Sequence, residues 1–270
     1  MPTINARVID ISHYNSVASD GFKKAAAFGI WGVINKVTES TGYVDQTYAA
    51  RRQAVKDAGL LWGAYHFVRP GSMSAQVEHF LRHAAPDDAT LLALDWEVST
   101  VSVAAAREFL QRIIDRTGRK AVIYSGHTAK EMLGNVADTF FGSHRLWHAQ
   151  YSSAWTVQKS WKSPWIWQFS GDNLGPLPHG LPGFTLSGKQ ICDMNHYGGT
   201  RDELAAEWVE GGAPSRSDPV PASPFIEPSA ENVKKLQATL NKLGASPALV
   251  EDGNIGPRTF TAIVRTIEAK

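Results

Sequence analysis

The sequence predicts an α/β fold: a small TIM-like (β/α) barrel with an incomplete outer helix layer near its last three strands, followed by a small all-α C-terminal module. Short apolar segments alternate with helical periods over the first 210 residues, which predicts the barrel. Residues 152–189 have no amphipathic helical pattern, which predicts the gap in the helix layer. At 210–229 proline, serine and glycine accumulate without periodicity, which indicates a linker.

The expected boundaries follow this change in composition. We expect a barrel domain at 1–210, a Pro/Ser-rich linker at 211–228 and a small helical module at 229–270. A module of about 40 residues is near the lower limit for independent folding.

Eight segments have the apolar, β-branched character of buried strands. Eight strands in so short a region favour a compact barrel, since a complete (β/α) barrel typically needs about 250 residues. Missing helices outside the last three strands account for the difference. An open doubly wound sheet fits the same alternation and stays an alternative. The segments are residues 6–12, 32–40, 60–68, 91–98, 121–126, 145–151, 165–170 and 190–197.

Helical periods separate several of these strands. A short helix is expected at 22–28, and a longer one at 45–58 with Asp45 as its cap and Gly59 as its terminator. Ser102 caps the clearest helix, whose apolar residues are Ala106, Phe109, Leu110, Ile113 and Ile114. In the C-terminal module two apolar stripes predict two helices: Val233, Leu236, Leu240 and Leu243, then Phe260, Ile263, Val264 and Ile267.

Composition excludes several classes of protein. With 43% hydrophobic and 20% charged residues and a net charge of +1, the chain is globular and gives no reason to expect a nucleic-acid partner. No apolar run approaches the ~20 residues that cross a bilayer, and no signal peptide is visible at the start. Cys192 is the single cysteine, which excludes a disulfide framework and a multi-cysteine metal site. We expect a monomer with no cofactor and no bound metal.

The nine tryptophans in 270 residues admit two interpretations. Large aromatic side chains dominate the buried area of any core. When exposed, their flat rings stack on the apolar faces of sugars. The count alone leaves both interpretations open.

Four carboxyl groups stand where apolar segments end. Asp10 lies in the first segment, Asp95 and Glu97 in the fourth, and Asp193 in the last. In a parallel barrel the carboxyl ends of the strands meet at the rim that holds the active site. Because burying an unpaired carboxylate is costly, four acids converging at one rim indicate a function. Each of them alone is also compatible with a helix cap or a surface ion pair.

Asp95 and Glu97 suit one particular chemistry. They are two positions apart on a strand, so their side chains face the same way, about 6–7 Å apart. In glycoside hydrolysis one carboxyl protonates the leaving oxygen while a second stabilises or attacks the anomeric carbon. Mutual repulsion and partial burial would keep one of them protonated near neutral pH. The spacing lies between those of retaining and inverting enzymes and does not fix the stereochemistry.

Metal-dependent hydrolysis is the competing chemistry. His13, His66, His148 and His196 lie near strand ends and could join the carboxylates around a divalent ion. No His-x-His or His-Glu-x-x-His spacing supports this. No Gly-x-Ser-x-Gly elbow and no Walker-type glycine loop occurs either.

Eight short motifs follow one another in a characteristic order: V-I-D-I-S at 8–12, Lys36 with Thr38-Glu39, G-A-Y-H-F at 63–67, L-D-W-E at 94–97, I-Y-S at 123–125, L-W-H-A-Q-Y at 146–151, W-Q-F at 167–169 and D-M-N at 193–195. In this order they resemble glycoside hydrolase family 25, the Chalaropsis-type lysozymes of phage endolysins and bacterial autolysins. The resemblance covers roughly residues 6–200. Ser40 and His148 depart from the residues commonest in the family, and neither belongs to the acidic set.

The resemblance implies an N-acetylmuramidase that cuts the β-1,4 bond between N-acetylmuramic acid and N-acetylglucosamine in peptidoglycan, with retention. It implies Glu97 as general acid and base and Asp95 as its partner, either as nucleophile or by orienting the substrate's 2-acetamido group. Asp10 and Asp193 are then supporting carboxylates. The implied sugar contacts are Lys36, Tyr65, Phe67, Tyr124, Trp147, Tyr151 and Gln168.

The tail carries a second resemblance. The segment V-K-K-L-Q at 233–237, followed by Leu240-Asn241, Leu243-Gly244 and Asp252-Gly253, resembles the helical peptidoglycan-binding module common in cell-wall hydrolases. We therefore expect an endolysin-like enzyme whose partner is the peptidoglycan glycan strand. It would be made in the cytoplasm, act on the wall from the periplasm or outside, and depend on a holin or host lysis for export. The alternatives are a non-catalytic wall-binding barrel, a metal-dependent peptidoglycan amidase and a related glycosidase such as a chitinase.

Overall fold

The computed structural model describes residues 4–209, 230–246 and 248–252, together with Thr259, Ala262, Ile263, Arg265 and Thr266. The chain divides into two compact units, Met1–Asp218 and Pro219–Lys270. The expected linker at 211–228 lies outside the described residues, as do Phe260, Val264 and Ile267 of the last expected helix.

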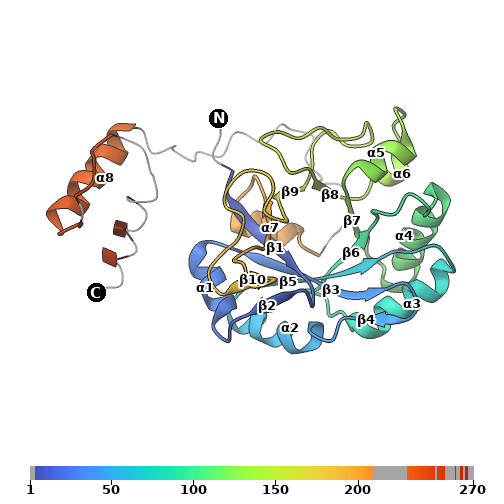
Figure 1. The fold of residues 1–270 in the computed structure, drawn as a ribbon. Helices are drawn as coiled ribbons and strands as arrows, with labels where there is room; N and C mark the ends of the chain where they lie inside the picture. The colour runs from blue at the N-terminus through green and yellow to red at the C-terminus, as the bar shows by residue number, and fades with distance from the viewer. Residues whose placement is uncertain are drawn as a thin grey trace. The chain divides into compact units, whose positions relative to one another are not determined.

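Within residues 4–209, eight strands close into a barrel (Figure 1), which confirms the barrel prediction against the open sheet. Their hydrogen-bonded order is β1, β11, β9, β8, β7, β6, β5 and β3, and β3 pairs again with β1. The strands are β1 (Ala6–Ile11), β3 (Gly32–Glu39), β5 (Leu61–Phe67), β6 (Leu91–Asp95), β7 (Val122–Ser125), β8 (Leu146–Ala149), β9 (Ile166–Ser170) and β11 (Asp193–His196). The short β4 (Tyr43–Val44) extends the sheet beside β3.

The last strand runs the opposite way from the other seven. From β1 and β3 round to β9 the neighbours are parallel, whereas β11 is antiparallel to both β9 and β1. The parallel barrel from which the sequence analysis argues is therefore wrong for β11. An antiparallel strand needs no crossover helix, and the chain from β9 to β11 instead forms β10 (Phe184–Leu186), which pairs with β2 (Asn15–Val17).

The helices surround the first two thirds of the barrel. They are α1 (Gly21–Phe28), α2 (Tyr48–Asp57), α3 (Met73–Ala84), α4 (Val103–Thr117), α5 (His127–Leu133), α6 (Thr139–Gly142) and α7 (Arg201–Glu207). No helix is present between residues 143 and 200 of the described barrel, so the outer layer is incomplete where the sequence predicts.

Two expected caps have different outcomes. The Ser102 hydroxyl accepts the backbone N–H of Ala105 at 3.2 Å and caps α4 as predicted. Asp45 does not cap α2, which begins at Tyr48; its Oδ1 instead accepts the Thr47 backbone N–H at 2.9 Å.

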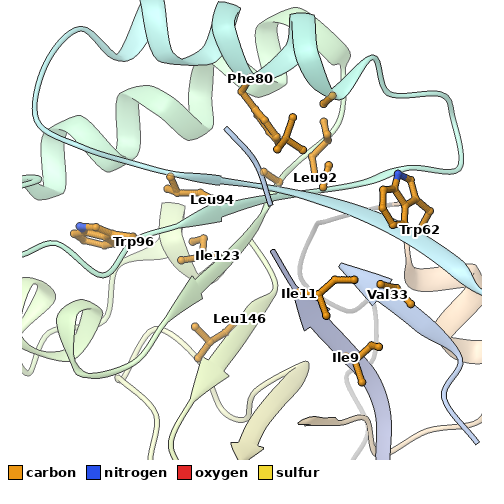
Figure 2. Close-up of a cluster of buried hydrophobic side chains, with 14 of the residues drawn as sticks. Ile9, Ile11, Val33, Trp62, Phe80, Leu92, Leu94, Trp96, Ile123 and Leu146 are labelled. Atoms are coloured by element: carbon orange, nitrogen blue, oxygen red, sulfur yellow. The ribbon is translucent and has the colours of Figure 1, made fainter. Parts of the chain in front are cut away.

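Strand residues alternate between two apolar layers. The outer layer includes Ile9, Leu92, Leu94 and Ile123, which belong to the same buried cluster as helix residues. Figure 2 shows Leu92 close to Phe80 of α3. The alternate positions point into the barrel and form a second buried cluster, which includes Val8, Ile34, Ala93, Val122 and Ile166. Because side chains alternate with a period of two, the residues two positions beyond this inner cluster also face inward.

The C-terminal unit contains α8 (Ala230–Lys242). Of the expected stripe, Val233 and Leu240 are buried, whereas Leu243 is 63% exposed. Leu240 packs with Leu249 and Ala262 in a small cluster of its own. The Asn241 side chain accepts the backbone N–H of Leu249 at 2.7 Å and so ties the segment after α8 back to the helix.

Candidate active site

The candidate site is the inward-facing layer above the apolar interior, at the carboxyl ends of the parallel strands. Two positions beyond Val8, Ile34, Ala93, Val122 and Ile166 of the inner cluster, the strands carry polar groups. These groups are Asp10, Lys36, Asp95, Tyr124 and Gln168. The alternation that builds the core therefore also places these side chains together.

Asp10 and Asp193 face each other across neighbouring strands. They are direct partners in the antiparallel pairing of β1 with β11, so their side chains lie on the same face of the sheet. Asp193 is the first residue of β11 rather than one near its carboxyl end, and it reaches the rim because this strand runs in reverse. Asp193 thus lies at the rim where the sequence analysis expects it, but it begins an antiparallel strand and does not end a parallel one.

Asp10 is 7% exposed and its Oδ2 accepts two amide hydrogen bonds. Asn195 Nδ2 donates at 2.7 Å and Gln168 Nε2 at 2.9 Å. Burial raises the pKa of Asp10 to about 6; these two hydrogen bonds oppose the rise, and the nearby Glu97 carboxylate adds to it. Asp10 therefore titrates close to neutral pH.

Asp95 is the least solvated carboxyl of the set. It ends β6, is 5% exposed, and its Oδ1 has no hydrogen-bond partner among the described residues. Burial, and next the charge of Glu97, raise the pKa of Asp95 well above its usual range. A carboxyl in this position gains stability when it is protonated or when a ligand donates to it.

Glu97 follows β6 and is the solvent-exposed member of the set. Partial burial of the carboxyl raises the pKa of Glu97, and the charge of Asp172 adds to the rise. The opposing influences are His127, a hydrogen bond from Tyr124, and Lys36. The pKa of Asp193 is raised well above its usual range by burial and then by Asp10. Repulsion among the four acids makes it harder to ionise all of them together, so the site favours keeping some of its carboxyls protonated.

The predicted sugar contacts fall into two groups. Lys36 and Phe67 lie at the rim beside β4: Lys36 Nζ is 2.6 Å from Glu39 and 4.9 Å from the centroid of the Phe67 ring. Tyr65, Tyr124 and Trp147 form an aromatic wall, with ring centroids 4.5 Å apart for Tyr124 and Trp147. The Tyr124 hydroxyl donates to Gln168 Oε1 at 2.7 Å.

Tyr151 lies over the turn after β9. A Cβ added to Gly171 would come within 2.5 Å of the Tyr151 hydroxyl and 2.6 Å of Asp193 Oδ1. Glycine at this position therefore lets the tyrosine and the carboxyl approach the turn closely. All eleven predicted site residues lie at this end of the barrel, although Trp147 is only 1% exposed.

The tryptophans belong mainly to the core. Seven of the nine are buried: Trp62, Trp96, Trp147, Trp161, Trp165, Trp167 and Trp208. Trp96, between the two acids, points outward, where its ring stacks on Phe141 at 5.7 Å. Trp155 is 38% exposed. The packing interpretation of the tryptophan count is therefore the better one.

Sequence reasoning missed three residues at the site. Asp172 and His127 both act on the charge of Glu97, and Asn195 binds Asp10. Asp172 and His127 lie just after β9 and β7, where the chain turns at the same rim. Asn195 could have been predicted, because it is two residues after Asp193 and must share its face of the strand.

Two kinds of feature are absent from the residues that the structure describes. No group of three or more His, Cys, Asp or Glu side chains is placed to hold a metal ion. None of the described helices has the length and the apolar composition that a membrane-spanning segment requires.

Acid-catalysed cleavage of a glycosidic bond needs one carboxyl group that is protonated and another that is ionised. The barrel and the carboxyl groups at its rim place the chain among the glycoside hydrolases. The match to a family model is specific. Residues 9–175 match glycosyl hydrolases family 25, and since this is more than half of the chain, the protein belongs to that family.

Relatives support the assignment. Lysozyme M1 of Streptomyces globisporus is 27% identical over 186 residues, which are 62% of this chain and 63% of that protein. A muramidase from Trichobolus zukalii has 29% identity and a TM-score of 0.63, covering 76% of this chain and 99% of that structure. A family GH25 lysozyme from Aspergillus fumigatus has 26% identity and a TM-score of 0.63, covering 75% and 98%. The chain thus spans less than two thirds of its curated relative.

Proposed function

We propose that this protein is a lysozyme that hydrolyses the β-1,4 bond between N-acetylmuramic acid and N-acetylglucosamine in peptidoglycan. The observation that carries the proposal is the contrast within the acid set. Glu97 is exposed and has a raised pKa, whereas Asp95 and Asp10 lie buried beside it. Family membership and the named lysozyme and muramidase relatives support the same activity.

In this proposal Glu97 acts first as an acid. Its raised pKa favours the protonated form that an acid needs, and its exposure lets it reach the bridging oxygen of the glycan. Asp95 acts beside it, either by attacking the anomeric carbon or by accepting the N–H of the 2-acetamido group, which then attacks in its place. Asp95 Oδ1, which has no hydrogen-bond partner in the described part of the chain, is the acceptor for this contact. Glu97 then activates the water that completes the reaction with retention.

Asp10, whose anion accepts two amide hydrogen bonds, supplies negative charge near the positive centre that develops in the transition state. Asp193, its partner across β1 and β11, is the second supporting carboxyl. Lys36, Tyr65, Phe67, Tyr124, Tyr151 and Gln168 hold the sugar rings, with Trp147 packed beneath Tyr124. A sugar stacked on these rings would exclude water from the acid pair, which strengthens the electrostatic contacts.

The C-terminal unit, with its expected bounds of 229–270, is proposed as a wall-binding module. Tethering to an insoluble substrate raises the local concentration of the catalytic barrel. With this module the chain resembles an endolysin, made in the cytoplasm and dependent on a holin or host lysis to reach the wall. The glycan strand of peptidoglycan is its partner, and the protein is proposed to act as a monomer.

The test uses purified peptidoglycan and the full chain. Glu97→Gln is expected to lower the rate at which reducing ends appear by at least ~10², the scale of losing a general acid, while wall binding is retained. Mass spectrometry should find N-acetylmuramic acid at the new reducing ends of the wild-type products. Glu108→Gln, an exposed glutamate on α4, is the matched control and should be fully active.

Three outcomes would contradict the proposal. N-acetylglucosamine at the new ends would indicate a different glycosidase. New free amines without reducing ends would indicate an amidase. Unchanged turnover in Glu97→Gln would remove the assigned acid. Proton NMR of the first products tests retention, which requires the β-anomer to appear before mutarotation.

A further inference from the structure

Asp10 lies at the centre of a buried hydrogen-bond chain that crosses the barrel. Its Oδ2 accepts from Asn195 on β11 at 2.7 Å and from Gln168 on β9 at 2.9 Å. Both amide side chains are 0% exposed. Because neither side chain is exposed to solvent, its protein neighbours determine which way its amide oxygen and nitrogen point.

Each amide has a second neighbour on its far side. Trp147 Nε1 donates to Asn195 Oδ1 at 2.6 Å, and the Tyr124 hydroxyl donates to Gln168 Oε1 at 2.7 Å. An indole N–H is a donor and never an acceptor. Trp147 therefore requires the oxygen of Asn195 on its own side, which leaves the Asn195 N–H for Asp10.

We propose that Trp147 and Asn195 are positioning residues that fix the direction of this hydrogen-bond chain. With the indole N–H in place, the amide N–H of Asn195 always donates to Asp10 and stabilises the Asp10 carboxylate as an anion. This inference concerns a step before the sugar binds. It rests on the proposed function only where activity is the readout.

The need for such a device follows from what surrounds Asp10. Burial and neighbouring acids favour its protonated form, whereas the two amide donors favour the anion. If the indole N–H were absent, the Asn195 amide could rotate and present its oxygen, which accepts from a protonated carboxyl. The titratable groups that interact with Asp10 are Glu97, Asp95, Asp193, Tyr65, Tyr124, Tyr151 and Cys192.

The variant Trp147→Phe tests this because it removes the N–H and keeps an aromatic ring beside Tyr124. In protein labelled with ¹³C, the carboxyl carbon of Asp10 should titrate about one pH unit higher than in the wild type. The acid limb of kcat/KM against pH should move the same way, with roughly a tenfold loss below the midpoint and little loss above it.

Trp161→Phe is the matched control. Trp161 is also buried and its Nε1 donates to the backbone carbonyl of His144 at 2.8 Å, away from the acids. It should lose comparable thermal stability and keep the wild-type titration of Asp10. If Trp147→Phe does not fold, Tyr124→Phe removes the donor at the other end, frees Gln168, and should raise the Asp10 midpoint likewise. Because the Tyr124 hydroxyl also hydrogen-bonds Glu97, the Glu97 titration is followed in the same spectra, and an Asp10 shift that only mirrors a Glu97 shift would count against the inference.

An unchanged Asp10 titration in the folded variants would overturn the inference, as would an equal shift in Trp161→Phe. Because the carboxyl titration is measured without substrate, this result is separate from the fate of the proposed function. A protein with no wall-cleaving activity but a shifted Asp10 midpoint would retain the inference and lose the function.

Discussion

At the scale of single residues, the site depends on how charge is shared among neighbouring carboxyls. Asp172 is an exposed acid in the turn after β9, and its charge raises the pKa of both Glu97 and Asp193. It has φ +51°, a left-handed conformation that asparagine tolerates well. Asp172→Asn therefore removes the charge while the backbone keeps its shape.

We expect Asp172→Asn to lower the pKa of Glu97, since a nearby negative charge no longer opposes its ionisation. The alkaline limb of kcat/KM should move to lower pH by less than about one unit, because an exposed charge is screened by water and salt. Raising the ionic strength should shrink the difference. Asp115→Asn on α4 is the control; an identical shift in that variant would contradict a local effect.

The acids were predictable from the sequence because each lies in an apolar strand segment that a core alone would leave neutral. Asp10 and Asp95 follow directly from the period of two along β1 and β6. Asp172 and His127 were not predictable in this way, because turns place them and turns carry no periodic signal. Asp95 illustrates a further limit, since its missing hydrogen-bond partner is visible only in three dimensions.

At the scale of elements, the turn between β7 and α5 holds the segment that carries Glu97. The Ser125 hydroxyl donates to the Trp96 carbonyl at 2.8 Å, and the Thr128 hydroxyl donates to the Glu97 carbonyl at 2.9 Å. Both hydroxyls are buried and both bonds cross from one β/α unit to the next. The position of the catalytic acid therefore depends on a neighbouring element as well as on its own strand.

Thr128→Val keeps the shape of this side chain and removes the bond to the Glu97 carbonyl. We expect a stability loss of about 1–2 kcal/mol, the cost of leaving a buried acceptor unpaired, and a several-fold fall in kcat with little change in KM. Thermal unfolding and steady-state kinetics measure the two effects. Ser102→Ala, which removes the cap of α4, should cost about 1 kcal/mol and leave kcat unchanged. Equal effects of both variants on kcat would contradict a specific role for the turn.

The order of the strands and of the main helices along the sequence was predictable, because strands repeat with a period of two residues and helices with a period of 3.6. The direction of β11 was not, since an apolar segment reads the same in either orientation. Two consequences could not be foreseen: Asp193 pairs directly with Asp10, and the long connection through β10 pairs with β2. Helix α3 was also missed, although Ser72 caps it through the Ala75 N–H.

At the scale of the whole molecule, function and stability oppose each other. Raising the pKa of a carboxyl from its ordinary 3.8 to about 6, as in Asp10, makes its ionised form about 3 kcal/mol less favourable in the fold. Asp95, Glu97 and Asp193 are shifted in the same direction. Much of the core elsewhere is ordinary apolar packing, so this rim is where the barrel gives up stability for chemistry.

The pH dependence of stability has two opposing sources. Carboxyls with a raised pKa bind protons more tightly in the fold, so their contribution to stability falls as pH rises from about 4 through 6. Buried His66 and His144 have their pKa lowered to about 4, so the unfolded chain takes up protons first and stability falls as pH drops from 6.5 towards 4. The folding stability of the whole protein therefore changes little with pH. Single variants separate the contribution of the carboxyls from that of the histidines.

Asp95→Asn isolates the carboxyl part. Asparagine is close in size, carries no charge, and replaces an oxygen that has no hydrogen-bond partner among the described residues. We expect the Tm at pH 7.5 to rise by about 2–4 °C, and the gain to vanish near pH 4, where the wild-type carboxyl is already protonated. Turnover should fall severely in the same variant. Calorimetry from pH 4 to 8 measures this, with Asp115→Asn as the control for a general charge effect. A gain that persists unchanged at pH 4 would show that shape rather than charge at Asp95 limits stability, and the electrostatic account of the rim would fail.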